Sequence, residues 1–499
     1  MHLSLEKLIQ RLKHVAQLDN ILNILHWDEK VNLPPNSATG RAEQIKALTE
    51  IAHREFTDPT IGELLEELNA LPDESFSLPE KTIIRETRRD YLRAIKLPAT
   101  FVAEKKTAES IGYHAWVKAR ESNDFSLFVP ILEELLDLSK QEAAFVDPRI
   151  QAYDYHIDLH DQGLDAKIIQ QLFIELKKDL LPLVKTILAS SHKPRASILK
   201  NFPIETQKSF ALLVAQKLGF DFSQGRLDVS VHPFCSGHSG DRRITTRFNE
   251  NVPLDSLFST IHEVGHALYE QGFAPENYGT PLGQAVGMAV HESQSRLWEN
   301  QVGRSRAFWK FFEPLYRQQF PNALSSIDSE AFYKVINAVE LNPIRVDSDE
   351  VTYNLHIILR FGLEKELFEG TVAVKDLREA WNQKSKELLQ LTPKNDKEGV
   401  LQDIHWSGAA FGYFPSYTLG NMIAAQLWEV AKKTIPSLET SFEKGDFTPL
   451  LNWLRESIHQ FGKQYRTQGL VQKVTGSSIS TKPLINYLKE RYLPLYGGK

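Results

Sequence analysis

The stretch His262-Glu263-Val264-Gly265-His266 places two histidines one helical turn apart, with a glutamate beside the first. Residues at positions i and i+4 lie on the same face of a helix, so both imidazole rings can bind one zinc ion. The intervening glutamate can then reach a water next to that ion. The flanking sequence has a helical pattern, because apolar residues recur at spacings of four, three and four at Leu257, Ile261, Val264 and Leu268. The stretch therefore predicts a helix that carries two ligands of a metal site.

A third ligand is expected in the next helical segment, residues 285–300, because catalytic zinc usually takes three protein ligands and one water. Glu292 and Glu299 lie on one face of this segment, so either carboxylate can turn toward the two histidines. His291 is a rival, although it points about 100° away from Glu292 around the helix. Spacing alone favours Glu292 over Glu299.

Composition and charge are typical of a globular enzyme. The chain has 499 residues, of which 42% are hydrophobic and 24% are charged, and these are ordinary globular values. A net charge of -6 argues against a nucleic-acid partner. The single cysteine, Cys235, excludes an internal disulfide and suits a reducing compartment. Neither a signal peptide nor a membrane span is apparent, so we expect a cytoplasmic protein without a membrane partner.

Helical patterns dominate the chain, which predicts a mainly α fold in a single domain over residues 1–499. Two short segments, residues 227–231 and 243–248, have the pattern of strands and predict a small β-hairpin near the metal site. Pro314 falls inside a helical pattern and should kink or split that helix. The predicted helices cover residues 3–25, 61–71, 79–97, 128–143, 166–181, 205–218, 307–320, 329–341, 377–389, 419–433 and 450–461.

Six motifs in a fixed order make the chain resemble the carboxypeptidase Taq family of metallocarboxypeptidases. Beside the histidine pair at 262–266 and the His-Glu-Ser segment at 291–300, the chain matches four further family signatures. Ser348 stands where one of them, IRxxAD, has alanine, and this is a small departure. The four signatures are HPF at 232–234, DxRxT at 241–245, IRxxAD at 344–349 and GxxQDxHW at 399–406.

The resemblance implies a zinc- or cobalt-dependent carboxypeptidase that removes single residues from peptide C-termini with broad specificity. It also implies a helical zincin-like domain with two lobes around a deep groove, and a homodimer. By motif match, the metal ligands are His262, His266 and Glu292, and Glu263 is the catalytic carboxylate. Glu263 is then expected to take the proton of a metal-activated water during attack and to pass it to the leaving amine.

Other candidates for catalysis lie near the last motif. Tyr417 is the expected hydrogen-bond donor to the developing oxyanion, a role that is typically worth about 3–4 kcal/mol, and Tyr413 is the alternative. Either tyrosine could instead be a core aromatic. His405 is expected to bind the substrate or the tetrahedral intermediate, or else to orient a ligand. His232 is expected to shape the closed end of the groove, and Asp403 to hydrogen-bond a ligand histidine or its helix.

A carboxypeptidase must also bind a free α-carboxylate, and arginine suits this role because its planar guanidinium binds carboxylates in bidentate fashion. Arg345, in the IRxxAD signature, is the leading candidate, and Arg243, in DxRxT, is the other. Either could instead hold a nearby aspartate in a structural ion pair, namely Asp241, Asp347 or Asp349.

Two other functional classes are compatible with the metal motif. An oligopeptidase or dipeptidase would share the histidine pair and cut other bonds. A non-enzymatic binding protein would share the scaffold, but the intact Glu263 and the complete set of three ligands argue against decay of the site. The two candidate carboxylate anchors favour the carboxypeptidase.

Overall fold

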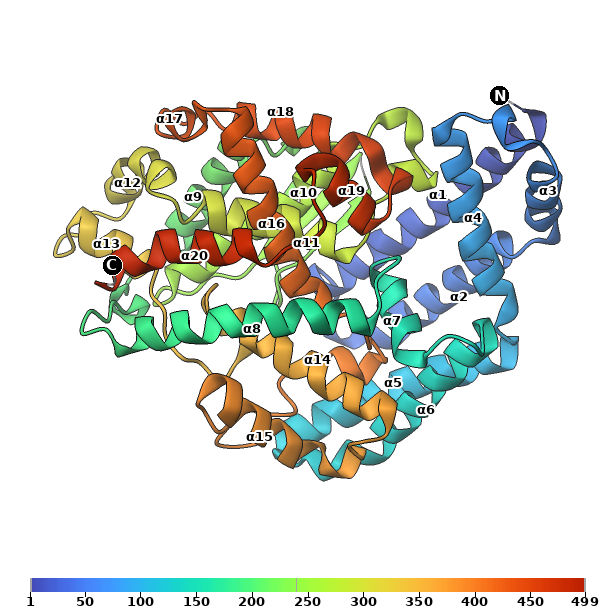
Figure 1. The fold of residues 1–499 in the computed structure, drawn as a ribbon, viewed down its shortest axis with the longest axis horizontal. Coiled ribbons are helices and arrows are strands. Elements are labelled where there is room, and N and C mark those ends of the chain that lie inside the picture. The colour runs from blue at the N-terminus through green and yellow to red at the C-terminus, as the bar shows by residue number, and fades with distance from the viewer. Residues whose placement is uncertain (1, 239, 498–499) are drawn as a thin grey trace.

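The computed structural model describes residues 2–238 and 240–497, which form mainly α-helices and one small sheet (Figure 1). The α-helices are α1 Leu3–Val31, α2 Ala38–Phe56, α3 Pro59–Asn69, α4 Leu78–Lys96, α5 Ala99–Ser122, α6 Val129–Val146, α7 Ala152–His160, α8 Ala166–Ala189, α9 Ile204–Leu218, α10 Pro253–Gln271, α11 Met288–Arg296, α12 Arg306–Gln319, α13 Ser329–Ile336, α14 Tyr353–Glu369, α15 Leu377–Leu389, α16 Pro415–Thr434, α17 Leu438–Phe442, α18 Thr448–Ser457, α19 Thr467–Thr475 and α20 Lys482–Leu495. The strands are β1 Gly225–Val229, β2 Cys235–His238 and β3 Asp241–Thr246. The predicted mainly α fold with a small sheet is confirmed.

The sheet differs from the predicted hairpin in one respect. Its strand order is β1-β3-β2, and both predicted strands are present as β1 and β3. They run parallel, with Leu227 opposite Ile244, whereas β2 pairs antiparallel with β3. The unpredicted β2 lies between them in sequence, so the chain reverses direction twice and β1 and β3 point the same way. The hairpin is therefore formed by β2 and β3.

Helix α10 forms where its apolar stripe predicts it and ends before Gly272. The four stripe residues are all buried, as expected for the inward face of an amphipathic helix. A β-carbon at Gly265 would lie 2.6 Å from the Ser295 Cα atom of α11, so the absence of a side chain there lets the two helices approach closely. This contact brings the turn of α10 that carries His266 next to α11.

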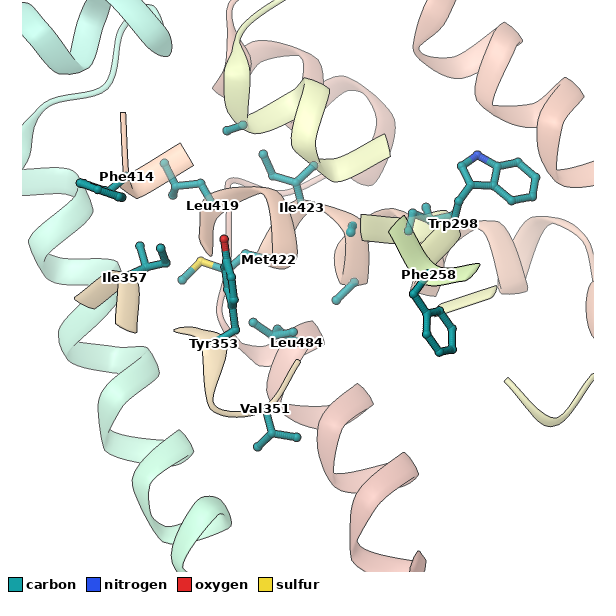
Figure 2. Packing of buried hydrophobic residues seen from close by; sticks show 14 of the residues in the cluster. Phe258, Trp298, Val351, Tyr353, Ile357, Phe414, Leu419, Met422, Ile423 and Leu484 are labelled. Atoms are coloured by element: carbon teal, nitrogen blue, oxygen red, sulfur yellow. The ribbon is translucent and has the colours of Figure 1, made fainter. Parts of the chain in front are cut away.

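A large hydrophobic core surrounds α16, most of whose residues are buried (Figure 2). It includes Tyr353 and Ile357 from α14, Met422 from α16 and Leu484 from α20, so segments far apart in sequence share one core. Burying one such large apolar side chain stabilises the fold by about 1.5–3 kcal/mol. The core therefore supplies the rigid support on which the first turn of α16 is held.

The N-terminal helices have a separate hydrophobic cluster, built from α1, α3 and α4. One residue from far along the chain completes it: Leu282, in the segment between α10 and α11. The same segment contacts α1 through a hydrogen bond of 2.5 Å from Asn20 Nδ2 to the Tyr278 hydroxyl. The organisation as one domain over residues 1–499 stays a prediction, as does the two-lobed shape with a deep groove.

Two prolines, Pro314 and Pro182, lie well inside helices of the described chain, and a third, Pro494, is the penultimate residue of α20. Pro314 is predicted to kink or split its helix, and α12 runs through it without a break, so the helix is not split. Pro182 likewise lies within α8, whose buried stripe continues past it at Leu183 and Ile187. Buried residues before and after Pro182 and Pro314 stabilise these two helices, and this offsets the backbone hydrogen bond that each of the two prolines removes. Of the helices in residues 2–238 and 240–497, none has the length and apolar character needed to cross a membrane.

Candidate metal centre

Three potential ligand atoms meet between α10 and α11. His262 and His266 from α10 and Glu292 from α11 each offer one such atom, and all of these atoms lie within 4.8 Å of one another. The Nε2 atoms of the two histidines are 3.2 Å apart. The Glu292 Oε2 atom is 3.6 Å from the His262 Nε2 atom and 3.5 Å from the His266 Nε2 atom.

These separations fit a tetrahedral metal ion. Donor atoms bound to one zinc ion at about 2.1 Å lie about 3.4 Å apart when the angles are tetrahedral. Two imidazole nitrogens and one carboxylate oxygen are also a common donor set for catalytic zinc. The three side chains therefore have both the chemistry and the spacing to hold such an ion.

Glu299 lies on the other side of the His262 ring. Its Oε2 atom is 2.8 Å from His262 Nδ1, so this carboxylate can hold the proton on Nδ1 and leave the Nε2 lone pair free for a metal. Glu299 belongs to a π-helical turn, Leu297–Val302, that follows α11 directly. A π-helical turn changes the angle between successive side chains, and here both Glu292 and Glu299 reach the same histidine.

Arg296 joins the two glutamates. Its guanidinium donates to Glu292 Oε1 at 2.6 Å and to Glu299 Oε2 at 3.1 Å. Burial opposes ionisation of Glu292, but the Arg296 charge, together with the neighbouring His262 and His266, outweighs it and holds the pKa of this carboxyl well below its ordinary value. Glu292 is thus kept charged with Oε1 occupied, so only Oε2 faces the two histidines.

The other candidate ligand, His291, is directed elsewhere. Its Nε2 atom is 2.6 Å from Glu270 Oε1, and Glu270 also pairs with Arg242 of β3. The His291 ring stacks on the His266 ring, with centroids 4.4 Å apart. His291 therefore packs against one face of a candidate ligand and does not share the cluster of donor atoms.

Glu263 lies on α10 beside His262 and is buried, with 6% of its surface exposed. Burial raises the pKa of its carboxyl to about 7. A carboxyl group with a pKa near neutrality exchanges protons readily under physiological conditions, as a general base and acid requires.

Two further predicted residues, His405 and Tyr417, lie side by side. The His405 Nε2 atom is 3.1 Å from the Tyr417 hydroxyl, and the Tyr413 and Tyr417 rings are 5.2 Å apart. Burial raises the pKa of Tyr417 well above its ordinary value, and the nearby Glu292 carboxylate contributes in the same direction. Tyr417 therefore keeps its proton at neutral pH and can act as a hydrogen-bond donor close to Glu292.

Arg345 is the centre of a buried charged cluster. Its Nε and Nη2 atoms lie 2.9 Å and 2.8 Å from Asp403 Oδ1, and Arg360 of α14 contacts the other oxygen of Asp403 at 2.6 Å. Asp403 was expected to hold a histidine or its helix, and instead it holds two arginines. The aspartate that pairs with Arg345 is therefore neither Asp347 nor Asp349. Segment 399–406 passes beside Arg345 and places Asp403 against its guanidinium.

Tyr353, which sequence analysis missed, links the Arg345 cluster to the candidate ligands. Its hydroxyl accepts a hydrogen bond of 2.8 Å from Arg345 Nη1, and the Arg296 guanidinium lies 4.5 Å from its ring centroid. The Arg345 guanidinium is also 5.0 Å from the Tyr417 ring centroid. The predicted carboxylate anchor, the predicted oxyanion donor and the candidate metal ligands are therefore neighbours.

The remaining two candidates lie at the sheet. Arg243 of β3 binds Asp241 through both Nε and Nη2, and its guanidinium lies 4.3 Å from the Trp27 ring centroid of α1. This is one of the structural ion pairs that the sequence left open. His232 is exposed just after β1. The roles of both residues in substrate binding stay predictions.

Comparison with known proteins identifies the relatives of this chain. Residues 7–492 match the carboxypeptidase Taq (M32) metallopeptidase family. The chain is 41% identical to thermostable carboxypeptidase 1 of Thermus thermophilus and covers 99% of both sequences. It is 38% identical to carboxypeptidase 1 of Bacillus subtilis over 97% of both. The solved structure of an M32 carboxypeptidase from Deinococcus radiodurans R1 superposes with a TM-score of 0.96 at 39% identity, covering 99% of this chain and 100% of the other.

Proposed function

Because this chain belongs to the carboxypeptidase Taq (M32) family and is a metallocarboxypeptidase, we propose that it releases single amino acids from peptide C-termini with broad specificity. The strongest support for this proposal is the placement of a buried arginine cluster beside a metal-binding cluster. The first can hold a free carboxylate while the second acts on the bond next to it.

In this proposal His262, His266 and Glu292 hold a zinc ion, for which cobalt can substitute. The ion, when bound, supplies a water of lowered pKa and polarises the scissile carbonyl. The Glu299 carboxylate fixes the His262 tautomer, and Arg296 keeps Glu292 ionised. Partners of this kind typically change metal affinity by about 10–100-fold when they are removed.

Glu263 is the proposed general base and acid. It takes a proton from the attacking water and delivers that proton to the leaving amine. Its burial supports this role, because a carboxyl group with a raised pKa holds the proton between the two steps.

Tyr417 is the proposed donor to the oxyanion. Its hydroxyl lies against His405, and burial lowers the pKa of His405 to about 3, so the imidazole is neutral. With its one proton on Nε2, His405 donates to the Tyr417 oxygen and leaves the Tyr417 hydroxyl proton free for the oxyanion. Because one ring nitrogen of His405 faces this hydroxyl, Tyr413 is the weaker candidate. A single donor of this kind is typically worth about 3–4 kcal/mol in the transition state.

Arg345 is the proposed anchor for the substrate carboxylate. Asp403 is in ion-pair contact with two buried guanidinium groups, those of Arg345 and Arg360, so the ion pairs of this cluster contain one more positive than negative charge among the residues that the structure describes. Burying an uncompensated charge is unfavourable, and a carboxylate arriving from the substrate would complete the pairing. An internal peptide bond would bring no such charge, which favours an exopeptidase over an oligopeptidase.

We also infer that the protein works in the cytoplasm as a homodimer. The six family motifs support the dimer, and the single thiol of Cys235 suits a reducing compartment. Light scattering of the purified protein and fractionation of cells test these two points.

The test of the proposed activity is release of free amino acid from an N-acylated Ala-Arg dipeptide. Wild type and Glu263→Gln are compared with zinc, with cobalt and after chelation. We expect metal-dependent release by wild type alone. The same substrate with an amidated C-terminus should be resistant, because it carries no carboxylate for Arg345.

Cleavage that survives amidation would indicate an oligopeptidase and leave Arg345 with a structural role. Absence of release under every metal condition would favour a non-enzymatic binding protein.

A further inference from the structure

A buried carboxylate that takes no part in the proposed chemistry lies where three helices begin. Asp161 follows α7, and only 1% of its surface is exposed. Its carboxylate accepts hydrogen bonds from the Ala289 backbone N–H at 3.0 Å, the Ser416 hydroxyl at 2.6 Å and the Thr467 hydroxyl at 3.1 Å. These donors belong to the first turns of α11, α16 and α19.

All three donors are uncharged. The N-terminal ends of the three helices therefore stabilise this buried carboxylate, a role that a cationic side chain often has. The positive ends of helix dipoles favour a negative charge near the first turn. Space for the carboxylate also depends on Gly287, because a β-carbon there would lie 2.7 Å from Asp161 Oδ1.

Two of these three helices carry proposed functional groups close to the contact. Glu292 lies three residues after Ala289 on α11, and Tyr417 directly follows Ser416 on α16. The two helices also touch nearby, since a β-carbon at Gly420 would lie 2.6 Å from Glu292 Cγ. A shift of either first turn would therefore move a metal ligand or the oxyanion donor relative to the other.

We propose that Asp161 is a positioning residue of the active site, which ties the first turns of α11 and α16 together and so sets the placement of Glu292 against Tyr417. This inference rests on the proposed function of those two residues. Thr467 provides an internal comparison, because it binds the same carboxylate from α19, which carries none of the proposed site residues.

The experiment compares Ser416→Ala with Thr467→Val, each of which removes one hydroxyl donor to Asp161. We expect similar losses of thermal stability. In Ser416→Ala the kcat for the blocked dipeptide should fall about tenfold with KM within about twofold, because the Arg345 anchor is untouched. In Thr467→Val both constants should stay within about twofold. Equal losses of kcat in the two variants would show that Asp161 only stabilises the fold and would overturn the proposal.

A second measurement does not depend on turnover. Zinc affinity of the Asp161→Asn apoenzyme, measured by competition with a chelating dye, should fall at least about tenfold, as for supporting residues of metal sites. Unchanged zinc affinity in a folded Asp161→Asn protein would also overturn the proposal. If this variant does not fold, the Ser416 and Thr467 pair still decides. Failure of wild type to release amino acids would instead refute the proposed function, and zinc affinity would still report on Glu292.

Discussion

The buried carboxyl group of Glu364 should make the stability of this protein depend on pH in a particular direction. Glu364 lies on α14 and is 0% exposed. It accepts hydrogen bonds from the Tyr153 hydroxyl at 2.9 Å, the Trp406 Nε1 atom at 2.8 Å and the Gly412 backbone N–H at 3.0 Å. It thereby holds both ends of the segment between His405 and Tyr413. Burial raises its pKa from 4.5 to about 7, because these bonds offset only part of the lost hydration.

The size of the effect follows from this shift. Between pH 4.5 and pH 7 the folded chain keeps a proton on Glu364 that the unfolded chain has released, so the free energy of unfolding falls as the pH rises. A carboxyl group with this shift contributes about 3 kcal/mol less to stability at pH 8 than at pH 4. Unfolding entropy of about 2 cal/mol/K per residue converts this loss to about 3 °C in the unfolding temperature of a chain of this length.

The assay is thermal unfolding of wild type and Glu364→Gln from pH 5 to pH 8, with a chelator present so that metal binding does not contribute. Glutamine cannot ionise, so the unfolding temperature of wild type relative to the variant should fall by about 2 °C over this narrower range. Glu133→Gln, at an exposed position of α6, is the control and should follow wild type. Parallel curves for wild type and Glu364→Gln would refute the reasoning.

Three other substitutions test the site. Gly420→Ala would place a β-carbon 2.6 Å from Glu292 Cγ and should weaken zinc binding at least about tenfold in a dye-competition assay, whereas Gly362→Ala has room and should not. Tyr417→Phe should lower kcat about 100- to 1,000-fold with little change in KM, and an unchanged kcat would exclude it as the oxyanion donor. Asp403→Asn leaves two buried guanidinium groups without a counter-charge and should destabilise the fold by about 3–5 kcal/mol in denaturant titration, so a loss below about 1 kcal/mol would contradict the charge argument.

Parts of the fold with a one-sided apolar pattern could be predicted from the sequence. Helix α10 is the clearest case, since its stripe, its length and its end at Gly272 all agree with the structure. Helix α14 was missed, because residues on most of its faces are buried and no stripe stands out. Helix α2 was missed for the opposite reason, since among its residues only Ala52 is buried. Periodicity reports one-sided burial, and both of these helices lack it.

The candidate site shows the same limit. Spacing on one helix brought His262 and His266 together, and helical geometry placed Glu292 and Glu299 on one face. The pairing of Arg345 with Asp403 joins segments 58 residues apart, and only the tertiary fold decides which aspartate returns to that arginine. The link through Tyr353 was missed for the same reason, because it depends on three segments meeting in space.

The contribution of Leu282 to the N-terminal hydrophobic cluster has a consequence for synthesis of the chain. Helices α1, α3 and α4 leave the ribosome early, yet the cluster they form lacks one apolar side chain until residue 282 has emerged. That residue lies in the short connection between α10 and α11, which carry the two parts of the candidate metal centre. The connection between α10 and α11 is thus needed both to complete the N-terminal hydrophobic cluster and to assemble the candidate metal centre. A ribosome that stalls before this connection would hold a chain in which both are incomplete.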